Sequence, residues 1–405
     1  MLTQKIVKVG IIGGGLMGRE LLALAGRWDA LIDHPVRPKV TAIADTSDSA
    51  REFFTKAGVS ESYSDYKQLL ESKNVDVVYI AVPHNLDQEI YLAAINSGKD
   101  FLAEKPFGID LKAAQLISDA LVGKKNFVRV SSEFPFYPGA QAAIKEVKNG
   151  RLGEIVEVRS GLLHSSDIDP LKVINWKRQT KFCGEIGVLG DLGMHAAHIP
   201  LRLGFKPTSV FAILDDIITH RPDAKGAQII CDTFDNAVLA LRAKSPESKR
   251  EFPMFWEMKR IAPGESNTFF FTATGLTGGV RFSTRDPAVY QSFSIKDGKQ
   301  IWSEIQPGHN TNWPVITGHI FEFGFPDALL QMWASFFAER EGVLGDKFAC
   351  ASVAEVLDSH KVFAAAASIS IGGPSARGLL IPAILNCLIP RSVLRYLCIK
   401  ELNIV

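Results

Sequence analysis

The sequence predicts an α/β fold with an N-terminal, doubly wound parallel sheet and a second α/β domain that carries a large, mostly antiparallel open sheet. Three observations favour this architecture. An apolar run ends in glycines at positions 13, 15 and 18, and strand-like segments then alternate with helix-like segments as far as Ser131. After Gly153 the pattern changes to strands with one exposed face, and helices return near the C-terminal end.

The glycines form a G-x-G-x-x-G pattern between a predicted strand, Lys5–Ile11, and a predicted helix, Leu16–Trp28. In this setting the first glycine permits a tight turn, the second lets the backbone approach a pyrophosphate, and the third lets helix and strand pack closely. The N-terminus of the helix faces the phosphate charge. The pattern therefore predicts a dinucleotide cradle of the Rossmann type. Its cofactor contacts are expected at Gly13, Gly15, Leu16, Met17 and Gly18.

The remaining segments of the first domain follow in the order that a parallel sheet with crossover helices requires. A proline-containing loop, residues 33–38, delays the second strand. The predicted strands after the first are Val40–Ala44, Val75–Ala81, Asp100–Ala103 and Phe127–Ser131. The predicted helices after the first are Ser49–Ala57, Tyr66–Glu71, Leu86–Ser97 and Leu111–Leu121.

The second domain is predicted from segments that alternate between apolar and polar residues. They are Ile155–Leu163, Ser209–Leu214, Gln228–Cys231, Ala237–Ala243, Thr268–Ala273 and Tyr290–Ile295. Two helices follow, Ala328–Glu339 and Ser352–Ala367. We expect a dinucleotide-binding domain over residues 1–132, a substrate-binding and oligomerisation domain over 133–371, and a tail of unclear structure over 372–405. The helices near 327–368 are expected to pack back on the first domain.

Charge and composition narrow the range of functions. The chain of 405 residues has 45 Lys and Arg against 44 Asp and Glu, and this balance argues against general nucleic-acid binding. Five cysteines without C-x-x-C pairs suit a reducing compartment better than a disulfide framework or a zinc site. No signal peptide precedes the first strand, and no apolar run has the length of a membrane span. We expect a cytoplasmic protein with no membrane or nucleic-acid partner.

Asp45 stands at the C-terminal end of the second predicted strand, next to Thr46. A carboxylate there can accept hydrogen bonds from both hydroxyl groups of the adenosine ribose and repels a 2′-phosphate, so NAD is expected rather than NADP. The alternative is a strand-end aspartate that caps the following turn. We favour the ribose role because of the glycine pattern, although Arg51 is near enough in sequence to meet a phosphate.

Glu104, Lys105 and Pro106 directly follow another predicted strand. Ligands of open α/β sheets bind outside the carboxyl ends of the strands, and a lysine there can polarise a substrate oxygen. From the tripeptide alone, a surface lysine before a turn proline is the better interpretation.

Asp191 and His195 are four residues apart in a glycine-containing segment, residues 187–198. In a helix they are neighbours on one face, so the carboxylate can hold the imidazole tautomer and support its protonated form. Such a pair can act as a general base or acid near neutral pH. The alternative, which this motif alone favours, is a helix N-terminus that Asp191 caps. A third ligand with suitable spacing to His195 and His198 is lacking, so no metal site is expected.

The order of these pieces resembles the Gfo/Idh/MocA family of nicotinamide-dependent oxidoreductases, which includes glucose–fructose oxidoreductase and inositol dehydrogenases. The likeness covers about residues 5–370, and the order and spacing of the motifs are more specific than any one of them. The resemblance implies a Rossmann domain followed by a domain with a large open sheet. In this family that sheet often serves as the oligomer interface, so a homo-dimer or homo-tetramer is expected.

The resemblance also assigns roles to individual residues. It implies that Lys105 touches both nicotinamide and substrate, that the bond before Pro106 is cis, and that Asp191 and His195 are the catalytic pair. Trp176 and Lys177 resemble a tryptophan–cation step near the family's site. The remaining cofactor contacts are then expected at Ala81, Val82, Pro83, His84, Asn85, Glu104, Lys105 and Pro106.

We therefore expect an enzyme that reversibly oxidises a secondary hydroxyl group of a sugar, polyol or inositol. In this mechanism His195 takes the hydroxyl proton while Asp191 holds the imidazole, and Lys105 stabilises charge on the reacting oxygen. Candidate substrate contacts are Glu133, Tyr137, His164, Asp167, Trp176, Lys177 and His195. They favour a neutral, polyhydroxylated substrate, because no tight arginine cluster indicates a phosphosugar.

Two alternatives stay open at the level of sequence. One is a glycosidase that uses bound NAD to oxidise, eliminate and reduce again. The other is a non-catalytic NAD-sensing protein, against which the presence of Lys105, Asp191 and His195 argues. The chain departs from the family pattern at Glu185 and Ile186, where glycines are usual, and these departures leave the substrate open.

Overall fold

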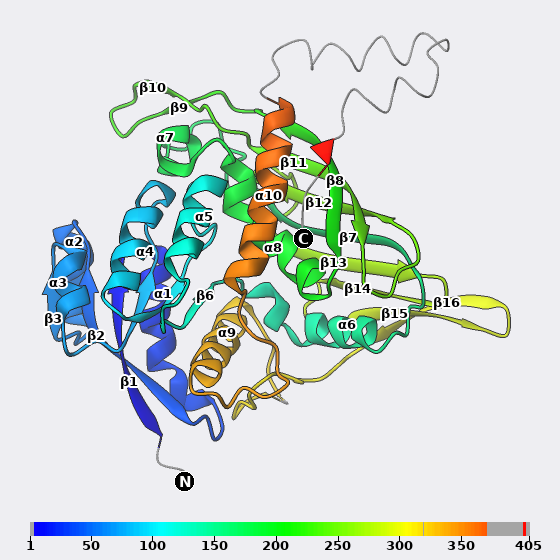
Figure 1. Cartoon of the computed structure of the whole chain (residues 1–405), viewed down its shortest axis with the longest axis horizontal. Coiled ribbons are helices and arrows are strands. Elements are labelled where there is room, and N and C mark those ends of the chain that lie inside the picture. The colour runs from blue at the N-terminus through cyan, green and yellow to red at the C-terminus, as the bar shows by residue number, and fades with distance from the viewer. Residues whose placement is uncertain (1–3, 319, 371–399, 402–405) are drawn as a thin grey trace. The chain divides into compact units, whose positions relative to one another are not determined.

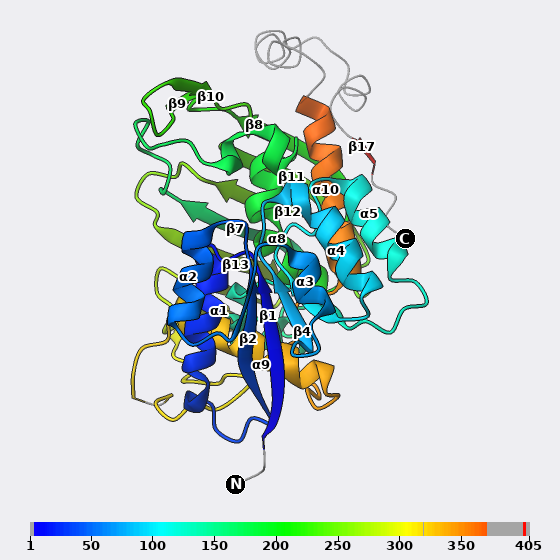
Figure 2. The same ribbon diagram turned by 90° about the vertical axis from the view of Figure 1, so that its left-hand side faces the viewer.

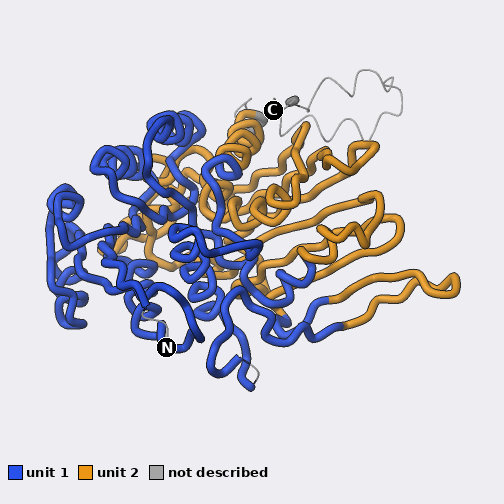
Figure 3. The backbone as a smooth tube through the Cα atoms, turned by 60° about the horizontal axis from the view of Figure 1, so that its bottom comes forward, with its two compact units in different colours: residues 1–143, 286–290, 305–356 blue, residues 144–285, 291–304, 357–405 orange. Residues whose placement is uncertain are grey.

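The computed structural model describes residues 4–318, 320–370, 400 and 401. It divides into two compact units (Figure 3). Unit 1 comprises residues 1–143, 286–290 and 305–356, and unit 2 comprises residues 144–285, 291–304 and 357–405. The tail expected over 372–405 lies outside the described residues except for β17, Lys400–Glu401.

Unit 1 is built on a parallel sheet with the strand order β3-β2-β1-β4-β5-β6. Every neighbouring pair in this order is parallel. The sequence prediction of a doubly wound sheet is therefore confirmed, and the order reverses between β1 and β4, where such sheets bind ligands. The strands are β1 Lys5–Ile12, β2 Val36–Ala44, β3 Glu61–Tyr63, β4 Val77–Ile80, β5 Asp100–Ala103 and β6 Val128–Val130.

Crossover helices cover both faces of this sheet. In Figure 2, α1 and α2 lie on one side of the strands, and α3, α4 and α5 lie on the other. Several of these helices begin at a polar cap: Ser47, Asp65 and Asp110 each accept a hydrogen bond from a backbone N–H of the first turn. The helices are α1 Leu16–Gly26, α2 Asp48–Lys56, α3 Tyr66–Glu71, α4 Asp87–Asn96 and α5 Leu111–Ala120.

A late helix, α9 (Phe325–Arg340), completes unit 1. It contacts α1 and β2, and its aromatic side chains meet aromatic residues from the start of the chain. The ring centroids of Trp333 and Tyr79 are 5.1 Å apart, and those of Phe337 and Trp28 are 5.6 Å apart. Such edge-to-face pairs add specific stabilisation to the apolar area that they bury.

Unit 2 contains a nine-stranded sheet with the order β16-β15-β14-β13-β7-β12-β11-β8-β17. It is mixed and mostly antiparallel, as the sequence predicts, with β7 and β12 as a parallel pair. A short hairpin, β9 (His220–Pro222) with β10 (Gln228–Ile230), stands apart from it. The other strands are β7 Ile155–His164, β8 Lys206–Asp215, β11 Asn236–Lys244, β12 Phe252–Lys259, β13 Asn267–Gly275, β14 Gly278–Ser283, β15 Tyr290–Lys296 and β16 Lys299–Ile305.

The predicted strands omit β3, β9, β14 and β16 as well as β12, and two of the differences from the structure have the same reason. The second strand begins at Val36 and not at Val40, and β12 is absent from the predicted strands. Each contains a proline, Pro38 or Pro253, which lacks a backbone donor. Pro38 pairs with β1, whereas β3 joins β2 only from Ala42 onward. Pro253 pairs with β11, whereas β7 joins β12 only from the next residue. Each proline thus lies at a position where its strand has a neighbouring strand on only one side.

Helix α8, Gly187–Arg202, packs across the middle of the unit 2 sheet, against β7 and β12. Its residues 187–200 are all buried. Helix α10, Val353–Ser370, runs beside α8 (Figures 1 and 2), and Gly193 faces the ring of Phe363. Within the described residues, no helix combines the length and apolarity needed to cross a bilayer.

Candidate functional site

The glycine turn of unit 1 has the geometry that a dinucleotide cradle requires. Gly13 has a φ of 100°, and a Cβ atom there would lie 2.1 Å from the backbone oxygen of Ala81. A Cβ atom on Gly18 would lie 2.2 Å from the backbone oxygen of Gly13. Both positions exclude a side chain, because the turn packs against the end of β4 and α1 packs against the turn.

Gly15 differs from these two glycines. It is the N-cap residue of α1, and apart from Gly15 itself and its two chain neighbours no described heavy atom lies within 4 Å of the position that its Cβ would occupy. Gly15 thus leaves room beside the N-terminus of α1, and backbone N–H groups at a helix N-terminus stabilise a pyrophosphate. The turn therefore fits a dinucleotide. Leu16 and Met17 open the helix beside it, and the Leu16 side chain is 75% exposed.

Asp45 follows β2 and lies beside the glycine turn. Its Oδ2 accepts a hydrogen bond from the backbone N–H of Gly14 at 2.7 Å, and its Oδ1 accepts one from Ser47 at 2.7 Å. Thr46 lies between Asp45 and Ser47 in the chain. Arg51 donates to the Asp45 carbonyl oxygen and forms an ion pair with Asp48. The Asp45 carboxylate is thus fixed beside the glycine turn, and Arg51, the nearest sequence candidate for a phosphate ligand, is paired with the acidic side chain of Asp48.

The segment after β5 has the cis peptide bond expected between Lys105 and Pro106. The hydroxyl group of Tyr79 donates to Glu104 Oε1 at 2.6 Å, and that of Tyr91 donates to the Glu104 carbonyl oxygen at 3.0 Å. Burial raises the pKa of both tyrosines well above the ordinary value. These neutral donors fix the residue before Lys105 from β4 and from α4.

The segment after β4, which contains Ala81, Val82, Pro83, His84 and Asn85, is connected to the same edge. His84 is buried, and Asp87 at the start of α4 is 2% exposed. Asp87 Oδ2 accepts a hydrogen bond from the backbone N–H of Gly108, two residues beyond Pro106. Burial raises the pKa of the Asp87 carboxyl well above its usual value. Asp87 therefore links the loops that follow β4 and β5.

Glu133 follows β6 at the same carboxyl edge and is 5% exposed. The β6 segment is joined to β5 by a hydrogen bond from Ser131 N to Ala103 O at 2.9 Å. Burial first, and then the charge of Glu104, raises the pKa of Glu133 to about 7. Tyr137 lies after the next turn, and burial raises its pKa as well. Unit 1 thus brings together at one edge all of its predicted cofactor residues and Glu133.

Unit 2 carries a second polar cluster, centred on α8. Asp191 and His195 lie one turn apart within this helix and are 3% and 4% exposed. The helix begins at Gly187, so the alternative in which Asp191 caps a helix is wrong. Lys177 Nζ donates to Asp191 Oδ1 at 2.7 Å, and Arg260 Nε donates to Oδ2 at 3.1 Å. Two cations therefore hold this carboxylate.

Arg260 is a residue that sequence reasoning missed. It directly follows β12, a strand that the sequence patterns did not predict, and it belongs to no recognised motif. A signal existed in the alternation of apolar residues over 252–258 that ends in Lys259 and Arg260, but Pro253 obscured it.

The structure also brings together three buried arginines that the sequence did not predict as a cluster. Arg178, Arg221 and Arg260 are each 1–2% exposed, and they lie near buried acids. Arg178 forms ion pairs with Asp167 and Asp235. Burial and the charge of Arg260 lower the pKa of Arg178 to about 9. Because buried aspartates accompany these arginines, the cluster is not an indication of a phosphosugar site.

The other predicted substrate residues of unit 2 lie around this cluster. His164 ends β7, and its carbonyl oxygen accepts a hydrogen bond from Ala262 N at 2.7 Å. Trp176 opens a short 3-10 turn, and Lys177 Nζ lies 5.7 Å from the centre of its ring. Asp167 is 2% exposed, so it serves the ion-pair network.

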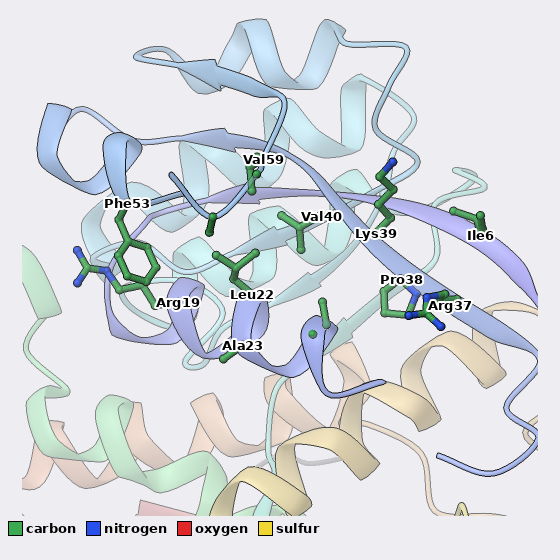
Figure 4. Close-up of a pocket in the computed structure, with 14 residues that line it drawn as sticks. Ile6, Arg19, Leu22, Ala23, Arg37, Pro38, Lys39, Val40, Phe53 and Val59 are labelled. Carbon is green, nitrogen blue, oxygen red and sulfur yellow. The ribbon is translucent and has the colours of Figure 1, made fainter. Parts of the chain in front are cut away.

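A surface pocket in unit 1 lies mostly away from the carboxyl edge of the parallel sheet. Figure 4 shows it between α1, β2 and the end of α2, with Arg19, Phe53 and Lys39 among its lining residues. It is bordered by residues 37–40, near the amino end of β2, whereas ligands of such sheets bind at the carboxyl ends. The pocket therefore extends toward the amino end of β2, although its lining residue Arg19 donates a hydrogen bond to the Gly14 carbonyl oxygen of the glycine turn at 3.3 Å. In the part of the chain that the structure describes, no group of three or more metal-ligating side chains is present.

Comparison with known proteins identifies relatives of the chain. Residues 7–132 match the family model GFO_IDH_MocA, described as "Oxidoreductase family, NAD-binding Rossmann fold". Levoglucosan dehydrogenase of Pseudarthrobacter phenanthrenivorans is 30% identical over 222 residues, which are 54% of this chain and 57% of the relative. Trans-1,2-dihydrobenzene-1,2-diol dehydrogenase of Bos taurus is 24% identical over 220 residues, which are 52% of this chain and 62% of the relative. The chain thus spans about half the length of the curated relatives that it matches.

Solved structures extend the likeness over most of the chain. A levoglucosan dehydrogenase in complex with NADH matches with a TM-score of 0.80 at 23% identity, covering 90% of this chain and 96% of that one. The apo form of levoglucosan dehydrogenase matches with a TM-score of 0.83 at 22% identity, covering 99% and 100%. At these identities the likeness establishes the fold of both units.

Proposed function

Because this chain belongs to the Gfo/Idh/MocA oxidoreductase family, with an NAD-binding Rossmann fold over residues 7–132, we propose that it is an NAD-dependent dehydrogenase acting on a secondary hydroxyl group of a carbohydrate or polyol. The reverse reaction, reduction of the keto-sugar, uses the same groups.

The observation that carries the proposal is the arrangement at the carboxyl edge of unit 1. The space in front of Gly15, the fixed carboxylate of Asp45 and the held Glu104-Lys105 segment follow β1, β2 and β5, in a sheet whose order reverses beside β1. In this arrangement Asp45 would hold the adenosine ribose, the turn at Gly15 would hold the pyrophosphate, and the residues that follow β4 and β5 would hold the nicotinamide half. The segment after β5 includes Lys105.

The proposed chemistry divides proton transfer and charge stabilisation among three side chains. NAD, when bound, supplies the hydride acceptor. Lys105 donates a hydrogen bond to the reacting oxygen and stabilises its negative charge. His195 accepts the hydroxyl proton at an imidazole nitrogen, and Asp191 holds the surrounding polar groups in place.

The substrate class is proposed from the relatives and from the side chains present. The relatives include levoglucosan, trans-1,2-dihydrobenzene-1,2-diol and D-xylose dehydrogenases, which are named for compounds with hydroxyl groups. Trp176 offers an aromatic face that suits a sugar ring, and Lys177 offers a donor for hydroxyl oxygens. We propose a neutral carbohydrate, with levoglucosan as the first candidate.

The unit 2 sheet supports a proposal for self-association. Strand β11 alternates between buried and half-buried residues, and α8 packs on one face of the sheet. We propose that the other face joins copies of the chain in a dimer or tetramer. Light scattering after size exclusion tests this: a monomer at every accessible concentration contradicts it.

The decisive test follows absorbance at the NADH band with NAD⁺ and a panel of levoglucosan, aldoses and inositols. We expect steady reduction with at least one of them. Sugar release from a glycoside without net reduction supports a glycosidase, and cofactor binding with no reaction across the panel supports a sensor. Either of these results contradicts a dehydrogenase.

A double-mutant cycle tests whether Lys105 and His195 act on the same reacting group. His195→Ala is expected to lower kcat by roughly a hundredfold or more, because a positioned acid–base group contributes about that much. Lys105→Met is expected to cost a similar factor, and the double variant little more than the worse single variant, because groups that act as a unit are not additive. Fully additive losses, or an unchanged kcat in His195→Ala, contradict the shared role.

A further inference from the structure

Arg260 connects two parts of the polar cluster in unit 2. Its Nε donates to Asp191 Oδ2 at 3.1 Å, and its Nη1 donates to the backbone oxygens of Lys177 at 3.1 Å and Phe234 at 3.3 Å. The other carboxylate oxygen of Asp191 accepts from Lys177 Nζ at 2.7 Å. One guanidinium group thus holds both a carboxylate and the backbone of the residue whose ammonium group binds that carboxylate.

The two cations that hold Asp191 differ in their surroundings. The side chain of Lys177 is 37% exposed, whereas that of Arg260 is 2% exposed. Water screens the charge of the lysine, but the charge of the arginine acts inside the protein, where attraction is stronger. Arg260 is therefore the partner whose charge acts more strongly on the buried Asp191 carboxylate.

The planar shape of the Arg260 guanidinium group also fixes the directions of its hydrogen bonds. A planar guanidinium group donates hydrogen bonds only in its own plane, so the Asp191 carboxylate and the Lys177 carbonyl oxygen, which both accept from Arg260, are held in a fixed relative position. An ammonium group has three donors, and one of those on Lys177 is directed at Asp191. The position of the carboxylate thereby determines where the ammonium group stands.

We propose that Arg260 is a positioning residue of the candidate site: it keeps Asp191 ionised and oriented, so that the Lys177 ammonium group meets an oxygen atom of the substrate at a fixed point. The inference rests on the proposed function, since a substrate with oxygen donors and acceptors is what this ammonium group serves. It gives Asp191 a task in addition to the support of His195 that the sequence predicts.

Arg221 provides a matched control. It is 1% exposed and belongs to the same region, but its guanidinium group donates to the backbone oxygens of Asp167 and Asp169. Replacing it removes a buried arginine of the same network while the Asp191 contacts stay in place. A purely structural effect is therefore expected in the Arg221 variant and in the Arg260 variants alike, whereas a positioning effect is expected only in the Arg260 variants.

The first experiment needs no substrate. The full chain is labelled with [4-¹³C]aspartate, and the Asp191 carboxyl resonance is assigned by its loss in Asp191→Asn. In the unmodified protein and in Arg221→Gln, we expect this resonance to stay in its ionised position at every pH above about 5. In Arg260→Gln, we expect the proton affinity of Asp191 to rise at least about tenfold, because a buried carboxylate loses its strongest counter-charge.

The second experiment measures kcat/KM against pH with NAD⁺ and the carbohydrate that the panel identifies. In Arg260→Gln the acid limb is expected to move to higher pH. In Arg260→Lys, which keeps the charge but loses the fork, the limb stays in place and kcat/KM falls by about ten- to a hundredfold through misplacement. The KM for NAD⁺ is expected to stay unchanged in both variants, and Arg221→Gln is expected to keep the original profile.

The outcomes separate this inference from the proposed function. An Asp191 resonance that titrates above about pH 5 in the unmodified protein overturns the role of Arg260, even if Arg260→Gln does not fold. A folded Arg260→Gln with the original titration overturns it as well, whether or not sugars are oxidised. A panel without turnover contradicts the dehydrogenase and leaves the NMR titration as the test of Arg260.

Discussion

A substitution at Gly15 is expected to change cofactor binding with little change in the stability of the fold. Its backbone is extended, with a φ of −71°, and its Cβ position is open, so alanine fits without strain. We expect Gly15→Ala to change the free energy of unfolding by less than about 1 kcal/mol, the range of an N-cap substitution. NAD⁺ affinity is expected to fall roughly ten- to a hundredfold, because the methyl group occupies the space required by the pyrophosphate.

Isothermal titration with NAD⁺ checks this prediction. Gly26→Ala is the matched control, because Gly26 ends the same helix and also has no neighbour among the described atoms within 4 Å of its Cβ position. Its NAD⁺ affinity is expected to equal that of the unmodified protein. Undiminished NAD⁺ affinity in Gly15→Ala shows that the pyrophosphate does not approach this turn.

Glu133 makes stability depend on pH. Its pKa rises from 4.5 to about 7 because burial and then Glu104 disfavour the charged form. The folded state therefore holds this proton more tightly than the unfolded state, and the stabilisation is complete below the unfolded pKa and lost as pH rises through about 7. The total is roughly 3 kcal/mol. Urea unfolding at several pH values is expected to show this decline in the unmodified protein.

Glu133→Gln removes the titrating group and keeps the size of the side chain. In this variant the decline in unfolding free energy between about pH 4.5 and 7 is expected to be smaller. Exposed Asp119, whose Oδ1 accepts a hydrogen bond from Gln115 on the same helix, supplies the control Asp119→Asn. Equal pH slopes in the unmodified protein and in Glu133→Gln rule out Glu133 as the cause.

Residues in a local motif were predictable from the sequence, and residues that act through distant contacts were not. Gly13, Gly18 and Asp45 have positions defined by a short stretch of chain, and the structure explains each of them. Arg260 reaches Asp191 across 69 positions. Its importance arises from the pairing of strands far apart in sequence, which no periodicity reports.

At the scale of elements, the contact between α8 and α10 is too close for a side chain. A Cβ atom on Gly193 would lie 2.3 Å from Phe363 Cζ, and that ring is fully buried beside Trp256. We expect Gly193→Ala to lower the free energy of unfolding by about 1–3 kcal/mol through overpacking. Urea unfolding measures this change.

A second substitution distinguishes overpacking from a helix effect. Phe363→Leu in the Gly193→Ala background is expected to recover part of the loss, because it frees space for the methyl group. Gly26→Ala, in a helix with open space, is expected to be neutral or stabilising by up to about 1 kcal/mol, as helix propensity predicts. If Gly193→Ala behaves like Gly26→Ala, the close packing of the two helices is refuted.

The elements themselves were predicted wherever one pattern dominated. The strands and helices between Val75 and Leu121 were predicted to within a few residues, because buried strands alternate there with capped helices. The start of β2 and the whole of β12 were not predicted, because a proline in a sequence indicates the end of a strand. Only the strand order shows that each proline has a side without a neighbouring strand, where a missing N–H group breaks no ladder hydrogen bond.

At the scale of the whole molecule, the sequence predicted both sheets and led to the expectation that helices near 327–368 pack back on the first domain, but it did not predict which side chains those helices meet. The order β3-β2-β1-β4-β5-β6 follows from the handedness of crossover connections. That residues 305–356 complete unit 1 depends on long-range packing of α9, whose aromatic side chains meet Tyr79, Phe127 and Trp28. An apolar helix near the C-terminal end contains no local indication of its partner.

The position of α9 along the chain has a consequence for biosynthesis. When the ribosome has completed the six parallel strands, the aromatic surface formed by Tyr79, Phe127 and Trp28 still lacks the helix that covers it. About 200 further residues must be added before Trp333 emerges, which takes roughly 10–40 s at ordinary translation rates. During that interval the nascent polypeptide exposes an aggregation-prone apolar surface. Chaperone binding is therefore expected to determine the yield of folded protein more than the free energy of unfolding does.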